Sequence, residues 1–175
     1  MKYFNIHKSL KIADFLTLAN AICGLLAIIF AIYGVFNLAA VLILFAAVFD
    51  FFDGKVARFS KKSNDLGKQL DSLADVVSFG VAPAVIGYML GIKSWYGIAA
   101  LAFYLACGVL RLARFNITDS KLVKGFEGVP ITAGGLIIAI LVFFTGYFPI
   151  ILNYMPIIYF VFGLLMISSI PIKKI

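Results

Sequence analysis

The chain has 175 residues, of which 63% are hydrophobic and 13% are charged, and its formal net charge is +7. Such an apolar composition excludes an ordinary water-soluble domain. The positive charge does not indicate a nucleic-acid partner, because the Lys and Arg residues flank apolar stretches, where they fix membrane topology and attract anionic lipid headgroups. We therefore expect an integral membrane protein surrounded by membrane lipids.

Apolar stretches follow one another along the chain, at about residues 14–33, 36–57, 67–90, 95–115, 131–148 and 150–170. A helix needs about 20 apolar residues to cross a hydrocarbon core of roughly 30 Å. Lipid offers no partner to backbone polar groups, so these segments are predicted to be helices. The predicted fold class is all-α: a six-transmembrane-helix bundle forming a single domain over residues 1–175, with a short N-terminal amphipathic segment. Gly87 and Gly91, at GxxxG spacing, permit close helix contact within one chain or between the chains of a homodimer.

The positions of the Lys and Arg residues predict the orientation of the bundle. They cluster near the N-terminus, in the turns after the second and fourth predicted spans and at the C-terminus, and only Lys93 lies in a turn on the opposite side. Cationic loops stay on the cytoplasmic side of a membrane. Both termini are therefore predicted to be cytoplasmic, in a multi-pass protein of the cell membrane. The acidic residues lie on or open toward the same side, so an active site would face the cytoplasm.

Four aspartates lie within two of the apolar spans and are the most informative feature of the sequence. Asp50 and Asp53 are three residues apart and Asp71 and Asp75 are four apart, so each pair lies on one face of its own helix. A charged residue within a span costs roughly 2.5–3.5 kcal/mol on insertion scales, so four of them require a functional reason. The polar stretch at residues 61–65 would fold the two helices into a hairpin in which the pairs meet at similar depth.

The four carboxylates together indicate a metal centre. In a partly dehydrated site they would repel one another unless a cation held them. Oxygen ligands without Cys or His favour Mg²⁺ or Mn²⁺, with Ca²⁺ as a further candidate, over zinc. Two ions about 3.5–4 Å apart would suit four carboxylates and a phosphoryl displacement. Solvated carboxylates that pair with Lys55, Arg58 and Lys68 are the alternative, but the aspartates lie several residues inside the apolar runs.

Small residues and one guanidinium lie at helical spacing from the aspartates. Gly54 and Ala57 would leave a hollow beside the metal ions that is large enough for a nucleotide, and Gly67 lies on the facing helix. Arg58 could bind a phosphate through two parallel hydrogen bonds. Taken singly, the small residues would also suit close helix packing, and Arg58 would suit a side chain that reaches the membrane interface. Their occurrence together with the aspartates favours a nucleotide site.

Residues 50–75 read DFFDGKVARFSKKSNDLGKQLDSLAD, which resembles the signature of the CDP-alcohol phosphotransferase family, DxxDGxxAR, eight residues, then GxxxDxxxD. Every fixed position matches, and the family's six-helix architecture would cover essentially the whole chain. The resemblance implies that the four aspartates bind the metal ions and that Asp75 is also the general base. It further implies contacts with the donor, CDP-diacylglycerol, from Gly54, Ala57, Arg58, Ser63, Asn64, Gly67, Thr17 and Asn20. The last two belong to TLAN in the first span, where Ala13-Asp14 replaces the family's usual proline.

Two later stretches, GVLRLARFN at residues 108–116 and FEGVPITAG at residues 126–134, resemble the phosphatidylserine synthase branch of this family. That branch would transfer the phosphatidyl group to the hydroxyl of L-serine and release CMP. Arg111 and Arg114, three residues apart on one helical face, suit a carboxylate, and Asn116 and Glu127 suit an ammonium group. Two arginines would equally suit the phosphate of glycerol 3-phosphate, which is the second candidate acceptor, or would anchor the helix end at the cytoplasmic surface.

Intramembrane carboxylates also mark the pathways of cation- or proton-coupled transporters. A transport path needs polar groups that reach both membrane faces, whereas here the outer half of the chain has almost none. A scaffold that binds lipid through its basic rim would leave the aspartates without a role. The sequence therefore favours an enzyme of phospholipid biosynthesis, and it leaves open whether the lipid tails are acyl or isoprenoid.

Overall fold

The computed structural model describes residues 12–59, 65–117, 126–168 and 171–172. The predicted amphipathic segment at the N-terminus, Ser63 and Asn64 lie outside this part of the chain. The described elements are α2 (Ile12–Ile32), α3 (Phe36–Phe59), α4 (Asp65–Asp75), the π-helix η1 (Val76–Val81), α5 (Ala82–Met89), α6 (Trp95–Ile117), β1 (Phe126–Glu127), α7 (Ile131–Thr145), α8 (Ile151–Ile167) and β2 (Pro171–Ile172).

Four of the described segments are long and apolar enough to cross a membrane, at Ala13–Ile32, Phe36–Val56, Leu66–Met89 and Trp95–Ile117. The predicted helical, multi-pass membrane architecture is confirmed to this extent. α7 and α8 are also apolar, but they have only 15 and 17 residues, fewer than the predicted spans. One small departure from an all-α chain is a two-residue antiparallel ladder, in which Phe126 pairs with Ile172 and Glu127 with Pro171.

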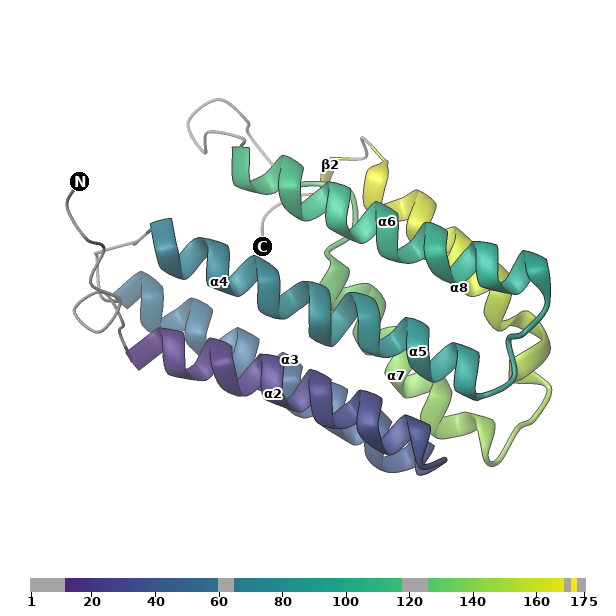
Figure 1. The fold of residues 1–175 in the computed structure, drawn as a ribbon. Helices are drawn as coiled ribbons and strands as arrows, with labels where there is room; N and C mark the ends of the chain where they lie inside the picture. The colour runs from purple at the N-terminus through teal and green to yellow at the C-terminus, as the bar shows by residue number, and fades with distance from the viewer. Residues whose placement is uncertain (1–11, 60–64, 118–125, 169–170, 173–175) are drawn as a thin grey trace, which may run out of the picture.

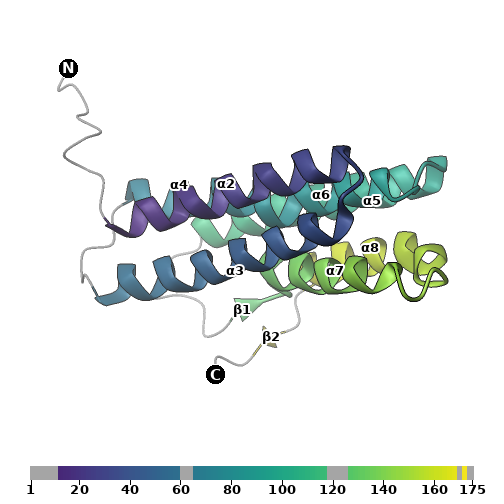
Figure 2. The same ribbon diagram turned by 90° about the horizontal axis from the view of Figure 1, so that it is seen from below.

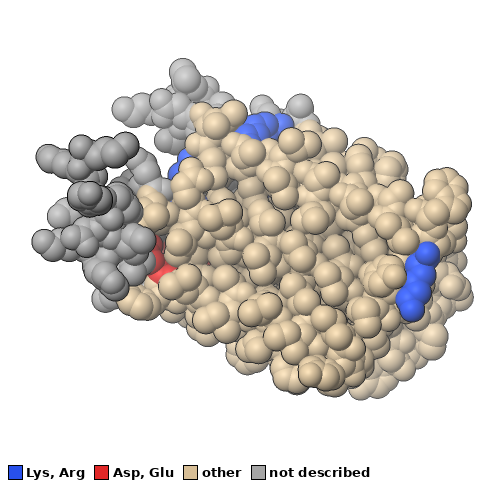
Figure 3. All heavy atoms as spheres, in the orientation of Figure 1, with Lys and Arg blue, Asp and Glu red and all other residues tan. Residues whose placement is uncertain are grey.

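The helices form two layers. Figure 2 shows α2, α4 with α5, and α6 in one layer, and α3, α7 and α8 in the other. Within the first layer, the span formed by α4, η1 and α5 runs between α2 and α6 (Figure 1). The most extensive contact between the layers joins α2 to α3, where fully buried alanines such as Ala27, Ala31, Ala39 and Ala40 let the two helices approach. On the face seen in Figure 3, uncharged side chains cover the middle of the bundle and the basic side chains lie toward its ends.

The central span changes its helical pitch at η1, directly after Asp75. Pro83 has no N–H group, so the carbonyl of Phe79, four residues earlier, loses its usual helical donor. The hydroxyl of Tyr104 on α6 donates to this carbonyl at 2.7 Å. The hydroxyl of Tyr159 on α8 donates to the carbonyl of Pro83 at 2.6 Å. Backbone groups in a membrane must find partners inside the protein, and these buried tyrosines supply them here.

Glycines on two neighbouring helices admit η1 at close range. A Cβ atom at Gly24 of α2 would lie 2.7 Å from the Cα of Ser78, and one at Gly135 of α7 would lie 3.0 Å from the Cα of Phe79. Any larger residue would push the helices apart. The segment that follows Asp75 is therefore held between α2 and α7 by backbone contact, which also fixes where the aspartates of α4 lie.

Candidate active site

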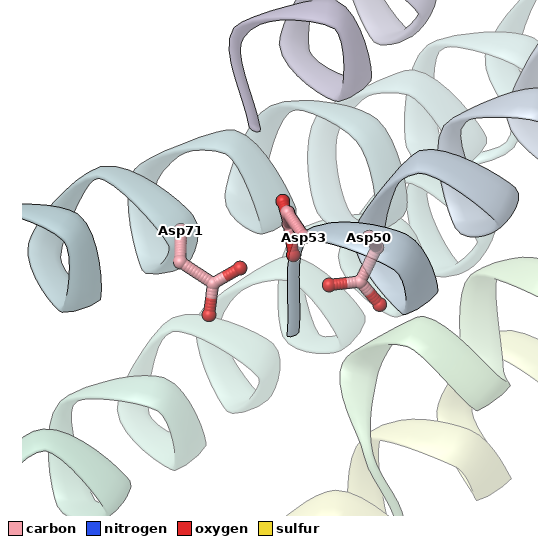
Figure 4. A group of neighbouring side chains, drawn as sticks. All are labelled: Asp50, Asp53 and Asp71. Atoms are coloured by element: carbon pink, nitrogen blue, oxygen red, sulfur yellow. The ribbon is translucent and has the colours of Figure 1, made fainter. Parts of the chain in front are cut away.

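Three of the four predicted aspartates converge at the hairpin of α3 and α4. Asp50, Asp53 and Asp71 each offer a carboxylate oxygen, and these oxygens lie within 4.8 Å of one another. Figure 4 shows the carboxyl groups of α3 and α4 turned toward one another. Asp53 is buried, with 3% of its surface exposed, and the other two are half-buried. The hairpin thus brings together side chains that are up to 21 residues apart in the sequence.

The donor set of this acidic cluster fits a divalent cation. Hard cations bind oxygen at about 2.0–2.6 Å, so two oxygens on one ion lie at most about 5 Å apart. The separations of up to 4.8 Å in the cluster satisfy this limit. All three ligands are carboxylates, which are the groups that Mg²⁺, Mn²⁺ and Ca²⁺ prefer over softer donors. The cluster is therefore a candidate metal centre, as the sequence predicted.

Asp75 follows Asp71 by one helical turn and interacts electrostatically with all three aspartates, but it is not part of the group whose oxygens all lie within 4.8 Å of one another. It is buried, with 6% of its surface exposed. The side-chain amide of Asn20 on α2 donates to its Oδ1 at 3.3 Å, and the hydroxyl of Ser78 donates to the backbone carbonyl of Asn20 at 2.9 Å. The structure thus ties Asp75 to α2. Its predicted roles as fourth ligand and general base stay predictions.

Two threonines from other helices hold the aspartates of α3. The hydroxyl of Thr17 on α2 donates to Asp53 Oδ2 at 2.7 Å, and Thr132, in the first turn of α7, forms a side-chain hydrogen bond with Asp50. Sequence reasoning placed Thr17 in the nucleotide pocket and did not single out Thr132. The signal for Thr132 was its place in FEGVPITAG, but only the tertiary fold shows that this stretch reaches Asp50.

The glycines predicted to line the donor site have different surroundings. Among the described residues, no atom lies within 4 Å of a Cβ built at Gly54, so the space beside Asp53 is open there. A Cβ at Gly67 would lie 3.0 Å from the carboxylate of Asp14, a buried side chain of α2 that sequence reasoning did not assign to the site. The side chains of Ala57 and Arg58 lie outside the described residues.

The residues predicted to bind serine lie at the C-terminal end of α6 and beyond it. Arg111 is 8% exposed, and its Nη2 donates to the carbonyl of Gly128 at 3.5 Å. Its Nε has no partner among the described residues. Arg114 is half-buried one turn further along, and the side chain of Glu127 is not among those described.

Asn116, which was also predicted to bind serine, is engaged with α4. Its side-chain amide donates to the hydroxyl of Ser72 at 2.9 Å, and the ammonium group of Lys68 donates to its backbone carbonyl at 2.9 Å. A cation at the C-terminal end of α6 also complements the helix dipole. These contacts join the end of α6 to the helix that carries Asp71.

The model of the family described as CDP-alcohol phosphatidyltransferase matches residues 10–169. Among curated proteins, the chain is 42% identical over 173 residues to the CDP-diacylglycerol–serine O-phosphatidyltransferase of Methanocaldococcus jannaschii, covering 98% of this chain and 78% of the relative. It is 44% identical over 140 residues to the protein of the same name from Bacillus subtilis, covering 78% of this chain and 77% of the relative. It is 39% identical over 143 residues to the one from Saccharomyces cerevisiae, covering 73% of this chain but only 52% of the relative. The chain therefore belongs to the CDP-alcohol phosphatidyltransferase family.

Proposed function

We propose that the chain is a phosphatidylserine synthase, which transfers the phosphatidyl group from CDP-diacylglycerol to the hydroxyl of L-serine and releases CMP. The observation that carries this proposal is the acidic cluster of Asp50, Asp53 and Asp71 within the membrane-spanning hairpin. The family supplies the reaction type. The names of the relatives from an archaeon, a bacterium and a yeast support serine as the acceptor.

In this proposal the four aspartates hold two divalent metal ions, Mg²⁺ or Mn²⁺, with Ca²⁺ as a further candidate. Bound at the cluster, such ions would neutralise the pyrophosphate of the donor and the charge that develops on the leaving phosphate. The open space at Gly54 receives the pyrophosphate, with Arg58 paired to a phosphate oxygen. Ala57, Gly67, Thr17, Asn20, Ser63 and Asn64 complete the predicted donor site. The lipid tails of the donor lie between helices or in the bilayer.

Asp75 acts as the general base of the proposed mechanism. It takes the proton from the serine hydroxyl, and the serine oxygen then attacks the lipid-side phosphorus in line with the bond to CMP. The new phosphorus–oxygen bond forms as the bond to CMP breaks, and CMP leaves with the electron pair. The proton stays on the carboxyl group of Asp75 until the products depart. Its buried position keeps competing water away from this step.

The guanidinium groups of Arg111 and Arg114 bind the carboxylate of serine. Burial of Arg111 with an unpartnered Nε supports this part of the proposal, since a buried donor without an acceptor costs free energy until a ligand supplies one. Asn116 and Glu127 bind the ammonium group. The amide oxygen of Asn116 has two lone pairs, so it can accept from the ammonium while it stays near Ser72.

The remaining expectations concern the setting of the enzyme. We propose one domain of six spans over residues 1–175, with both termini and the active site facing the cytoplasm, in the cell membrane. The charge distribution of the sequence supports this orientation. A homodimer is the proposed assembly, but the GxxxG spacing does not carry it, because Gly87 packs against Leu101 and Tyr159 of its own chain.

A panel of acceptor alcohols tests the proposal. Purified protein in detergent is supplied with CDP-diacylglycerol and with serine, glycerol 3-phosphate, inositol phosphate, choline or ethanolamine, and CMP release is measured with and without EDTA. We expect CMP with serine only, and none after EDTA. Release with glycerol 3-phosphate but not with serine would replace the acceptor, and release that persists in EDTA would contradict the metal centre.

A further inference from the structure

We propose that Thr17 and Asn20 are positioning residues, which hold Asp53 and Asp75 in the orientations that metal binding and proton transfer require. The proposal rests on the function proposed above. It assigns these two residues a positioning role in addition to the place in the donor site that is proposed above. The main support is that both side chains lie on one helix and donate to carboxylates of two other helices.

Thr17 restrains Asp53 through a short hydrogen bond in a buried place. Its hydroxyl lies 2.7 Å from Asp53 Oδ2 and 3.2 Å from the carbonyl of Ala13, and it has a single proton to donate. A carboxylate is a stronger acceptor than a backbone carbonyl, in agreement with the shorter distance to Asp53. With one oxygen of Asp53 engaged in this way, its carboxyl group cannot rotate freely, and its orientation toward Asp50 and Asp71 is set.

Asn20 restrains Asp75 and is itself held from two sides. It is fully buried, and its amide donates to Asp75 Oδ1 at 3.3 Å. Its backbone carbonyl accepts the hydroxyl hydrogen of Ser78 at 2.9 Å. One turn further along α2, Gly24 lets the backbones of α2 and η1 approach so closely that no methyl group fits between them. The backbone at Asn20 is therefore fixed by packing, while the Oδ1 of its amide is buried without a partner among the described residues.

Thr17 and Asn20 are three residues apart, so they lie on one face of α2 about one turn apart. Asp53 belongs to α3, and Asp75 ends α4. α2 therefore acts as a common support that fixes the carboxylates of the two hairpin helices relative to each other. Outer-shell hydrogen bonds of this kind orient metal ligands, and their loss typically costs about 10–100-fold in metal affinity or activity.

Binding of Mn²⁺ alone to the purified protein, measured by electron paramagnetic resonance, tests the role of Thr17. Thr17→Val keeps the shape and removes the donor, and we expect Mn²⁺ to bind about 10–100-fold more weakly. Thr17→Ser keeps the hydroxyl and should bind within a few-fold of the unmodified protein. Thr145→Val is the matched control, because the hydroxyl of this buried threonine donates only to a carbonyl of its own helix, that of Val142. It should leave Mn²⁺ binding unchanged.

Steady-state kinetics with serine and CDP-diacylglycerol test the role of Asn20. Asn20→Leu should lower kcat by about 10–100-fold and change the KM values much less, because the substrates still bind while the base is misoriented. Ser78→Ala removes only the bond to the Asn20 carbonyl and should give a smaller loss of kcat in the same direction. Thermal unfolding of each variant confirms that it is folded, and Thr17→Ala replaces Thr17→Val if valine prevents folding.

Normal Mn²⁺ binding by Thr17→Val, together with weaker competition by CDP against CDP-diacylglycerol in the turnover assay, would overturn the proposal in favour of direct nucleotide contact alone. An Asn20→Leu variant that raises KM for the donor at unchanged kcat would overturn it for Asn20. These outcomes differ from failure of the proposed function. A protein that releases no CMP with serine but loses Mn²⁺ affinity in Thr17→Val would retain the positioning role of Thr17 and lose the serine assignment.

Discussion

Replacing Gly54 with alanine tests the proposed donor space, because it should reduce donor affinity without lowering the stability of the fold. Among the described residues, a methyl group at this position would meet no atom within 4 Å. Alanine is favoured over glycine inside a helix by about 0.5–1 kcal/mol. Gly54→Ala should therefore unfold at the same temperature as the unmodified protein or at a higher one. The added methyl would nevertheless lie in the space proposed for the pyrophosphate, next to Asp53.

The expected loss of donor affinity follows from the size of one carbon atom. A misfit of one methylene group in a binding site is worth about 1–3 kcal/mol, which is roughly 10–200-fold in specificity. We expect KM for CDP-diacylglycerol to rise by a factor in this range while thermal stability stays or improves. Binding of CDP to the purified variant, measured by calorimetry, should weaken in parallel. A stable variant with unchanged donor KM and CDP affinity would refute the placement of the donor at Gly54.

Gly146 provides the control for this experiment. A Cβ atom there also meets no described atom within 4 Å, and Gly146 caps the C-terminal end of α7, with φ at −65°. Its backbone conformation suits alanine as well as glycine. Gly146→Ala should therefore leave the donor KM unchanged. A rise equal to that of Gly54→Ala would show that the effect is not local to the acidic cluster.

Three further substitutions test the support of the site. Gly24→Ala places a Cβ atom 2.7 Å from the Cα of Ser78; overpacking of this kind costs about 1–3 kcal/mol, and SDS-induced unfolding and turnover should both show a loss. Tyr104→Phe leaves the buried carbonyl of Phe79 without its donor, and unfolding in SDS should show a loss of about 0.6–1.7 kcal/mol. Asp71→Asn removes one anionic ligand from the cluster, and Mn²⁺ binding followed by electron paramagnetic resonance should weaken by more than the roughly 10–100-fold typical of an outer-shell change.

Each of these three expectations would be contradicted by one particular result. Full activity in Gly24→Ala would mean that the contact between α2 and η1 does not position Asp75. Unchanged stability in Tyr104→Phe would mean that the carbonyl of Phe79 finds another donor once the hydroxyl is gone. Unweakened Mn²⁺ binding by Asp71→Asn would remove α4 from the metal centre.

The sequence allowed the acidic cluster to be predicted because helical periodicity is a local property. The spacing of Asp50 and Asp53, and the polar stretch before Asp71, were enough to place these side chains at one level of a hairpin. The ends of the first two spans were predicted within a few residues for the same reason, since apolar runs bounded by polar or glycine residues define them. The structure gives Ile12–Ile32 and Phe36–Phe59.

Features that depend on contact between distant segments could not be predicted in this way. The change of pitch at η1 precedes Pro83, and the hydroxyl of Tyr104 on another helix donates to the carbonyl of Phe79 there. The four-residue spacing of Asp71 and Asp75 predicts a shared face, but it does not predict that the amide of Asn20 donates to Asp75. Pairing between Asn20 and Asp75, 55 residues apart, leaves no local trace in the sequence.

The predicted acceptor site also depends on contacts between distant segments. Arg111 could be selected from its position at the end of a predicted span, and in the structure it is buried with its Nε unpartnered among the described residues. Asn116 was selected because it suits an ammonium group, but its amide donates to Ser72 of α4. That contact depends on how α4 and α6 pack, and a helix-by-helix interpretation of the sequence contains no information on it.

Incorporation of isotope-labelled serine into lipid is the most direct test of the central claim. The unmodified protein and Asp71→Asn are incubated in parallel with labelled serine, CDP-diacylglycerol and Mg²⁺ or Mn²⁺, and both the lipid-extractable label and the CMP are quantified. The acidic cluster and the serine assignment together predict one labelled lipid per CMP released by the unmodified protein, and little of either product from Asp71→Asn. Release of CMP without label in the lipid, or equal incorporation by the two proteins, would contradict the account.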